Sequence, residues 1–310
     1  MAARFDVVLV GGGAAGLSAA LVLGRARRRV AVVDAGEPRN APAAHMHGFL
    51  SRDGMPPAQL RAAGRAEVRS YGVELIDGRV AGIEPGFVVR LADGETLHAR
   101  RILLATGARD ALPDVRGVRE RWGRDLLHCP YCHGWGVRDK PLGVLGPAPG
   151  SVAHALLVRQ LSDDVVFFPH TADPDPTELR QLRARGIAVE RGAVASLVVE
   201  DDRLTGVKMA DGRLTPRAAV FVRPMSQPQP DGLLAELGCA VDESGFVIAD
   251  AVGRTSVAGV WAAGNVVDPR LQVISSAGAG SATAIAINAD LVADDVEQAV
   301  ANQVAAASPP

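Results

Sequence analysis

The chain has 310 residues, of which 48% are hydrophobic and 22% charged, and its formal net charge is −2. This length allows two domains with separate cores, and a charge so close to zero gives no reason to expect nucleic acid or an anionic membrane as a partner. No run of about 18 apolar residues could cross a bilayer, and the first residues lack the pattern of a signal peptide. With three cysteines, two of them in one motif, we expect a cytoplasmic redox protein.

The N-terminal segment has the pattern of a dinucleotide-binding fold. An apolar strand leads into a glycine-rich turn and a helix, and a second strand ends in an acid, at residues 6–10, 11–16, 17–24, 30–33 and Asp34. In this GxGxxG turn, Gly11 permits the sharp bend, Gly13 lets a pyrophosphate approach the backbone, and Gly16 lets helix and strand pack closely. The helix N-terminus favours the phosphates, and Asp34 accepts hydrogen bonds from ribose hydroxyls.

A polar loop and a small sheet follow this segment. The loop at 39–53 carries His45 and His47, and residues 56–71 have helical spacing between a proline and a glycine. Short strands are predicted at 73–76, 80–83, 87–91 and 96–98, and a buried strand at 101–105 leads into Thr106-Gly107. These strands predict a small antiparallel meander inserted in the dinucleotide fold.

Two of the three cysteines lie in the sequence Cys129-Pro130-Tyr131-Cys132-His133-Gly134-Trp135. Cysteines at this spacing close a small disulfide or present one activated thiolate with a resolving thiol, and both arrangements perform redox chemistry. The alternative is half of a zinc site. His128 and His133 abut the cysteines at poor ligand spacing and Cys239 stands alone, so we expect no metal.

The remaining segments indicate a second α/β unit and a return to the first. Strands are predicted at 142–145, 165–168, 194–199, 204–209 and 218–222, and helices at 151–161 and 177–185. Residues 226–230, with two prolines, are expected to form a stiff linker. A helix of small residues at 275–289 completes the pattern.

Over nearly its whole length the chain resembles the low-molecular-weight thioredoxin reductases and their flavoprotein relatives. The motifs that carry the resemblance are the GxGxxG turn, Ala105-Thr106-Gly107 and Val260-Trp261-Ala262-Ala263-Gly264-Asn265. The resemblance implies an α/β fold of two Rossmann-like dinucleotide-binding domains. The FAD domain would be discontinuous, at 1–114 and 243–310, and a degenerate NAD(P)-like domain at 115–242 would carry the cysteines. It also implies a homodimer.

FAD is the cofactor that this resemblance implies. The residues expected to bind it are Gly11, Gly13, Ala14, Ala15, Gly16, Asp34, Ala35, Arg39, His47, Val80, Ala105, Thr106, Gly107, Gly264, Asn265, Gln272, Val273 and Ser276. Asn265 stands where the family usually has aspartate, and its amide oxygen can still accept a hydrogen bond from the ribityl chain. The helix that begins near Ala277 would point its N-terminus at the flavin pyrimidine ring.

The turn that binds NADPH in thioredoxin reductases departs from the pattern here. In Gly146-Pro147-Ala148-Pro149-Gly150-Ser151 the middle glycine is replaced by alanine, and the two prolines lack an N–H for phosphate. After the next strand, Pro169-His170-Thr171-Ala172-Asp173 stands where thioredoxin reductases have a cluster of arginines. We therefore do not expect this domain to bind a nicotinamide nucleotide.

The Cys-Pro-Tyr-Cys-His-Gly motif and the loop at 47–54 resemble those of the thioredoxin-reductase-like dithiol oxidases, which close disulfides in holomycin, gliotoxin and romidepsin. This implies an FAD-dependent oxidase that converts a small-molecule dithiol to a disulfide and O2 to H2O2. Cys129 would be the outer, exchanging thiol and Cys132 would face the flavin. His133 would be the general base, because an imidazole is well matched to removing a thiol proton at neutral pH.

Other interpretations stay open on the sequence alone. The chain could be a disulfide reductase for a thioredoxin-like protein, driven by NADPH or by a protein electron donor, or a redox-sensing flavoprotein. His133 could be structural, and His45 and His47 could line the thiol pocket or hold the backbone. Tyr131 and Trp135 either contact the substrate or pack in the core.

Overall fold

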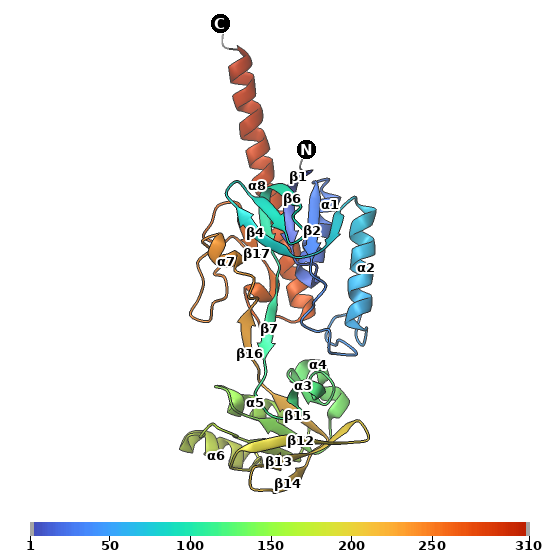
Figure 1. Cartoon of the computed structure of the whole chain (residues 1–310), viewed down its shortest axis with the longest axis vertical. Coiled ribbons are helices and arrows are strands. Elements are labelled where there is room, and N and C mark those ends of the chain that lie inside the picture. The colour runs from blue at the N-terminus through green and yellow to red at the C-terminus, as the bar shows by residue number, and fades with distance from the viewer. Residues whose placement is uncertain (1–2, 308–310) are drawn as a thin grey trace. The chain divides into compact units, whose positions relative to one another are not determined.

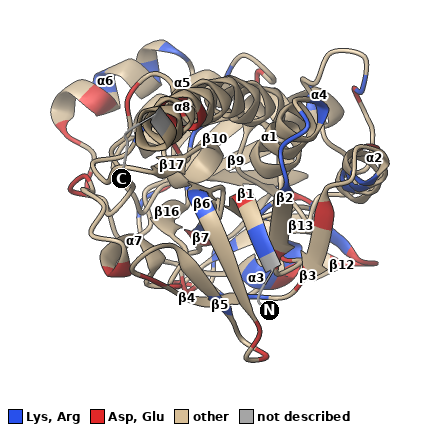
Figure 2. Ribbon diagram, turned by 90° about the horizontal axis from the view of Figure 1, so that it is seen from above, with Lys and Arg blue, Asp and Glu red and all other residues tan. Residues whose placement is uncertain are grey.

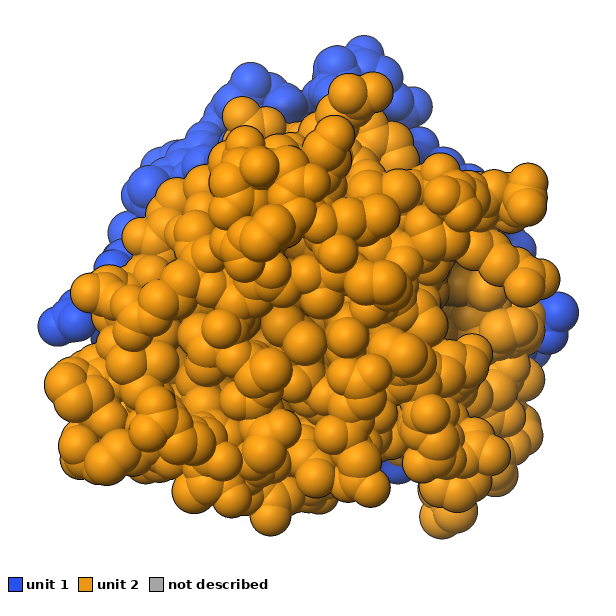
Figure 3. All heavy atoms as spheres, turned by 90° about the horizontal axis from the view of Figure 1, so that it is seen from below, with its two compact units in different colours: residues 1–39, 58–109, 227–310 blue, residues 40–57, 110–226 orange. Residues whose placement is uncertain are grey.

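The structure is a computed structural model that describes residues 3–307. The chain folds into two compact units, which Figure 3 shows in separate colours. Unit 1 consists of residues 1–39, 58–109 and 227–310, and unit 2 consists of residues 40–57 and 110–226. Each unit has its own sheet and its own hydrophobic core, which confirms the predicted α/β class.

A seven-stranded sheet forms the centre of unit 1, with the order β3-β2-β1-β6-β5-β4 and with β17 paired to β6. Its strands are β1 (Ala3–Val10), β2 (Val30–Asp34), β3 (Glu74–Asp77), β4 (Val80–Glu84), β5 (Val88–Leu91), β6 (Thr96–Leu104) and β17 (Val260–Ala262). The pairs between β3, β2, β1, β6 and β17 are parallel, and β4, β5 and β6 form the expected antiparallel meander. The prediction of separate strands at 96–98 and 101–105 is wrong, because β6 pairs with β1 from Leu97 to Leu104.

Helices α1 (Ala14–Arg25) and α8 (Val273–Ala307) pack against each other and against this sheet (Figure 1). A methyl group on Gly280 would lie 2.0 Å from the carbonyl oxygen of Ala15, so the two helices meet at backbone distance. The predicted helix 275–289 is too short, because good helix formers continue beyond it without Gly or Pro. The other helical elements of this unit are α2 (Pro57–Ser70), α7 (Leu233–Glu236) and the 3₁₀ turn η1 (Gly264–Val266).

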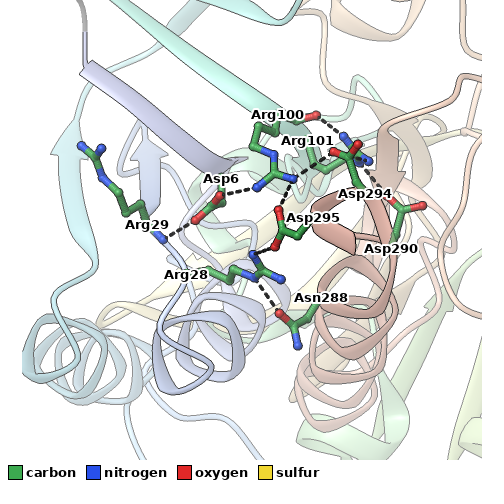
Figure 4. Close-up of polar contacts among 9 residues, drawn as sticks. All are labelled: Asp6, Arg28, Arg29, Arg100, Arg101, Asn288, Asp290, Asp294 and Asp295. Atoms are coloured by element: carbon green, nitrogen blue, oxygen red, sulfur yellow. Dashed lines mark hydrogen bonds and ion pairs between the residues drawn. The ribbon is translucent and has the colours of Figure 1, made fainter. Parts of the chain in front are cut away.

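An ion-pair network joins α8 to the central sheet of unit 1 (Figure 4). Its members are Arg28, Arg100, Arg101, Asp6, Asp290, Asp294 and Asp295. Arg100, in β6, lies 2.9 Å from Asp294 and 2.5 Å from Asp295 of the helix. It also lies 3.0 Å from Asp6 in β1. The network therefore fixes the middle of α8 against two strands of the sheet.

A five-stranded parallel sheet in the order β11-β10-β9-β15-β8 forms the centre of unit 2. The strands are β8 (Leu126–Leu127), β9 (Leu142–Leu145), β10 (Val165–Phe168), β11 (Ala188–Val189) and β15 (Ala219–Val222). The helices are α3 (Val118–Arg121), α4 (Pro130–Val137), α5 (Ser151–Val158) and α6 (Pro176–Ala184). A separate antiparallel sheet contains β12 (Val194–Glu200), β13 (Arg203–Met209) and β14 (Leu214–Pro216). Unit 2 thus has the predicted second dinucleotide-type fold.

Two of the four chain crossings between the units lie in the paired strands β7 (Ala108–Ala111) and β16 (Met225–Pro228), and the other two bound residues 40–57. The expected linker at 226–230 therefore begins as a strand, and Pro228 stands at its end, where a missing N–H is tolerated. The units divide the chain at 39/40, 57/58, 109/110 and 226/227, whereas the domain boundaries expected from the sequence are 114/115 and 242/243. Leu233 and Cys239 lie in the core of unit 1, which explains why the chain returns to unit 1 at residue 227 and not at residue 243.

Within residues 3–307, no helix is both long enough and apolar enough to cross a membrane. Over the same range, no group of three or more His, Cys, Asp or Glu side chains is placed to hold a metal ion. Basic and acidic residues are interspersed along the ribbon (Figure 2).

Candidate active site

The redox pair lies at the start of helix α4 in unit 2. Cys129 and Cys132 form a disulfide with Cα atoms 5.2 Å apart. Cys129 is the N-cap residue, and its sulfur accepts a hydrogen bond from the backbone N–H of Cys132 at 3.1 Å. Pro130 takes the first helical position, where no backbone N–H is needed and its fixed φ suits the helix. The N-terminus of α4 therefore favours a thiolate at Cys129.

His133 follows Cys132 in α4, and both of its ring nitrogens are buried. Neither nitrogen has a hydrogen-bond partner among the described residues. Burial, and then the charge of His47, lower the pKa of His133 below its ordinary value. The carbonyl group of Cys129 opposes this shift without meeting hydrogen-bond geometry. The imidazole is therefore neutral at pH 7 and can accept a proton.

The polar loop brings two further histidines into unit 2. Nδ1 of His47 lies 3.2 Å from Oδ2 of Asp53. Nδ1 of His45 lies 3.0 Å from the carbonyl oxygen of Gly54. His45 thus holds the backbone of its own loop. His47 has a carboxylate partner in Asp53, and, after burial, its charge lowers the pKa of His133.

The glycine turn of unit 1 fits a dinucleotide. A methyl group on Gly11 would lie 2.3 Å from the carbonyl oxygen of Ala105, and one on Gly16 would lie 1.9 Å from that of Gly11, so both positions require glycine. No atom lies within 4 Å of a methyl group built on Gly13, which leaves room for a pyrophosphate. Oδ2 of Asp34 is buried without a hydrogen-bond partner among the described residues, so it can accept a bond from a ribose hydroxyl.

The corresponding turn of unit 2, at residues 146–151, forms hydrogen bonds within itself. The carbonyl oxygen of Ala148 accepts hydrogen bonds from the N–H and the hydroxyl of Ser151, at 3.2 and 2.6 Å. A methyl group on Gly146 would lie 2.4 Å from the ring of Phe167, which packs against the turn. At the end of β10, Nδ1 of His170 accepts a backbone N–H from β12 at 2.9 Å. The N–H and the hydroxyl of Ser151, which could otherwise donate to a phosphate, are thus used within the turn.

The chain matches the family of pyridine nucleotide-disulphide oxidoreductases over residues 5–281. It belongs to that family. The chain is similar to HlmI, a protein with a crystal structure. The two are 56% identical in sequence, with a TM-score of 0.96, over 98% of each chain. An oxidoreductase from Agrobacterium tumefaciens is 35% identical, with a TM-score of 0.88, over 93% of this chain and 99% of that one. Thioredoxin reductase sirT from Leptosphaeria maculans is 31% identical over 314 residues, which cover 94% of this chain and 96% of the relative.

Membership of the pyridine nucleotide-disulphide oxidoreductases confirms that the chain is an oxidoreductase and that its cofactor is FAD. It also confirms the predicted resemblance to thioredoxin-reductase-like flavoproteins. Most residues predicted to bind FAD lie at the ends of four strands or at the start of α8. Those that follow β1, β2, β6 and β17 are Gly11, Gly13, Ala14, Ala15, Gly16, Ala35, Ala105, Thr106, Gly107, Gly264 and Asn265, and Asp34 ends β2 itself. Gln272 directly precedes α8, and Val273 and Ser276 lie in its first turn.

The role of three further predicted FAD residues, Val80, His47 and Arg39, stays a prediction. Val80 is buried in the core of unit 1 at the start of β4, and His47 belongs to unit 2. Nη1 of Arg39 donates to the carbonyl oxygen of Pro269 at 2.6 Å. The amide nitrogen of Asn265 donates to two backbone carbonyls, at 2.9 and 3.0 Å, which leaves its oxygen as an acceptor.

Sequence reasoning missed two features of the site. It did not place the cysteines on a helix, although Pro130 directly after a residue able to cap is a signal for a helix start. It also missed Arg65, whose Nη1 lies 3.6 Å from Oδ2 of Asp34. No local pattern identifies Arg65, because the contact joins α2 to the end of β2 and depends on how helix and sheet pack.

Proposed function

We propose that this chain is an FAD-dependent oxidase that converts a small-molecule dithiol to an intramolecular disulfide through Cys129 and Cys132, with O2 reduced to H2O2. One observation carries the proposal: the second nucleotide turn bonds to itself through Ala148 and Ser151, in a chain whose FAD turn and disulfide site are both formed. A pair that receives no electrons from NADPH takes them from substrate thiols or from another donor. In the proposed function, electrons flow from the substrate thiols to the cofactor.

The exchange steps follow from the geometry of α4. His133, neutral at pH 7, accepts the proton of a substrate thiol, and the thiolate attacks the sulfur of Cys129. The bond to Cys132 breaks, and a mixed disulfide forms between substrate and Cys129. The second substrate thiolate then attacks the substrate sulfur of this mixed disulfide. The product ring closes, and Cys129 leaves as a thiolate that the helix N-terminus stabilises.

FAD, when bound, supplies the acceptor for the two electrons of the cysteine pair and their route to O2. The balance is one dithiol and one O2 giving one disulfide and one H2O2, with two electrons and two protons moved. The residues of this chain position the sulfurs, accept the thiol proton at His133 and stabilise the thiolate of Cys129.

The Cys-Pro-Tyr-Cys-His-Gly motif, which resembles that of the dithiol oxidases, supports the oxidase over a reductase. The reductase remains the second candidate, because the relative sirT is named a thioredoxin reductase. In that role NADPH or a protein donor would reduce the flavin, and electrons would leave through Cys129 to a protein disulfide.

An anaerobic mixing experiment separates the two functions. We expect dithiothreitol to bleach the flavin absorbance of the holoenzyme and NADPH to leave it unchanged; rapid bleaching by NADPH would refute the oxidase. Under air, the dithiol alone should drive oxygen consumption. Cys132→Ser should abolish flavin reduction, whereas the control Cys239→Ala, in the core of unit 1, should retain it.

A further inference from the structure

Two aromatic side chains beside the disulfide are exposed. Tyr131 and Trp135 of α4 have exposed fractions of 70% and 75%. The alternative that these two side chains pack in the core is therefore wrong. The buried face of α4 is that of Gly134, where a methyl group would lie 2.4 Å from the side chain of Leu161. The two aromatic side chains thus belong to the open side of the helix.

Helix geometry places Trp135 next to both Tyr131 and the disulfide. Residues three and four positions apart are neighbours on a helix surface, so Trp135 lies one turn after Cys132 and Tyr131. A helical side chain leans toward the N-terminus and covers the preceding turn. Trp135 therefore lies on the helix surface one turn from the reactive sulfur pair.

The indole is held in place by Arg138. The guanidinium carbon of Arg138 lies 4.0 Å from the centre of the Trp135 ring, and Nη1 donates to the carbonyl oxygen of Trp135 at 2.7 Å. A cation over one face of the ring fixes its orientation and leaves the other face to a ligand. A side chain that is already ordered loses little entropy when a ligand stacks on it.

We propose that Trp135, together with Tyr131, binds a flat ring of the substrate, so that the enzyme prefers dithiols built on an aromatic or conjugated ring. The inference rests on the proposed function and adds the class of substrate. A flat ring stacks on an indole with an attraction beyond its buried area, whereas an aliphatic dithiol has no such face. Stacking on Trp135 would bring the thiols of the substrate close to the disulfide.

The size of the surface favours a small molecule over a protein. Two aromatic side chains present roughly 300–500 Å² in total. A stable protein interface buries about 800 Å² on each partner. The surface that Tyr131 and Trp135 expose on α4 suits a single small ring system.

Two dithiols test the proposal: benzene-1,2-dimethanethiol and dithiothreitol. Both close a six-membered disulfide, and only the first has an aromatic ring. We expect wild-type enzyme to have a lower KM for the aromatic dithiol, and Trp135→Ala to raise that KM about tenfold with little change in kcat. The KM for dithiothreitol should stay within about twofold, and Trp135→Phe should restore most of the affinity for the aromatic dithiol.

Tyr71→Ala is the matched control, because Tyr71 is also exposed under an arginine, Arg25, but lies in unit 1. It should change neither KM. An equal loss for both dithiols in Trp135→Ala would overturn the proposal, since Trp135 would then support the disulfide itself. Unchanged constants for both, with slower oxidation of a reduced thioredoxin, would overturn it in favour of protein docking. A wild-type enzyme that oxidises neither dithiol would overturn the proposed function and this inference with it.

Discussion

The backbone N–H of Cys132 donates a hydrogen bond to the sulfur of Cys129 over 3.1 Å. The bond forms because Cys129 caps α4 and Pro130 starts the helix. The two cysteines therefore differ in their surroundings: Cys129 faces the positive end of the helix, and Cys132 lies within its first turn. After reduction, this asymmetry favours the thiolate at Cys129.

The first prediction concerns the order in which the cysteines react. In the reduced holoenzyme at pH 7, iodoacetamide should alkylate Cys129 roughly tenfold faster than Cys132, because the thiolate is the nucleophile. Cys239 is the internal control: burial raises its pKa, partly opposed by the hydroxyl of Thr255, so it should remain unmodified. Peptide mass spectrometry over time gives the order, and faster labelling of Cys132 would contradict the assignment of Cys129 as the outer thiol.

The second prediction concerns the pH dependence that His133 imposes. Burial, and then His47, lower its pKa from 6.5, so the base is neutral at pH 7 and becomes protonated only at lower pH. The value of kcat/KM for dithiol oxidation should thus hold at pH 7 and fall as the pH drops through the lowered pKa of His133. His133→Gln should lower kcat/KM about 100-fold and abolish that acidic limb.

His45→Gln is the matched control for this pH profile, because His45 contacts only the carbonyl of Gly54 among its described hydrogen bonds. The acidic limb should survive in this variant. If His133→Gln kept both the rate and the limb, His133 would be a structural residue and another group would remove the thiol proton.

The third prediction concerns FAD retention and Asp34. Its buried Oδ2 offers a charged acceptor to a ribose hydroxyl, so Asp34→Asn should weaken FAD binding about tenfold. The flavin-to-protein absorbance ratio after gel filtration, and titration of apoprotein with FAD, measure the loss. Asp77→Asn is the control, because Asp77 shares Arg65 as a partner, at 2.6 Å, but is exposed at the end of β3. Equal FAD loss in both variants would point to Arg65 rather than to the carboxylate of Asp34.

The fourth prediction concerns the ion-pair network of Figure 4. Arg100 contacts Asp6, Asp294 and Asp295 while remaining partly exposed, so Arg100→Gln should lower the free energy of unfolding by about 1 kcal/mol. The difference should shrink in 1 M salt, where the Debye length falls to roughly 3 Å and the partly exposed charges are screened. Hydrogen exchange of α8 should also speed up beyond residue 285. Arg270→Gln, which breaks an exposed pair with Asp268, should leave this exchange unchanged.

Local patterns predicted much of the fold. The run from the first apolar strand through Gly11, Gly13 and Gly16 to Asp34 specifies strand, turn, helix and strand, because a sharp turn beside a close-packed helix tolerates only glycine at these positions. Most strands of unit 2 also lie where apolar runs indicated them. The local signals do not specify the lengths of β6 and α8. Pairing with β1 and contacts across unit 1 extend these two elements beyond their local signals.

The sequence by itself determined the chemistry: a dinucleotide turn for FAD, a Cys-x-x-Cys pair with an adjacent histidine, and a second turn with prolines in place of phosphate donors. Each is a property of neighbouring residues, so it can be identified without a fold. The tertiary structure decided which groups meet and which face solvent. In the fold both nitrogens of His133 are buried and Trp135 is exposed, because burial depends on what packs over a side chain and not on its neighbours in the chain. The fold of the polar loop also places the carboxylate of Asp53 beside His47.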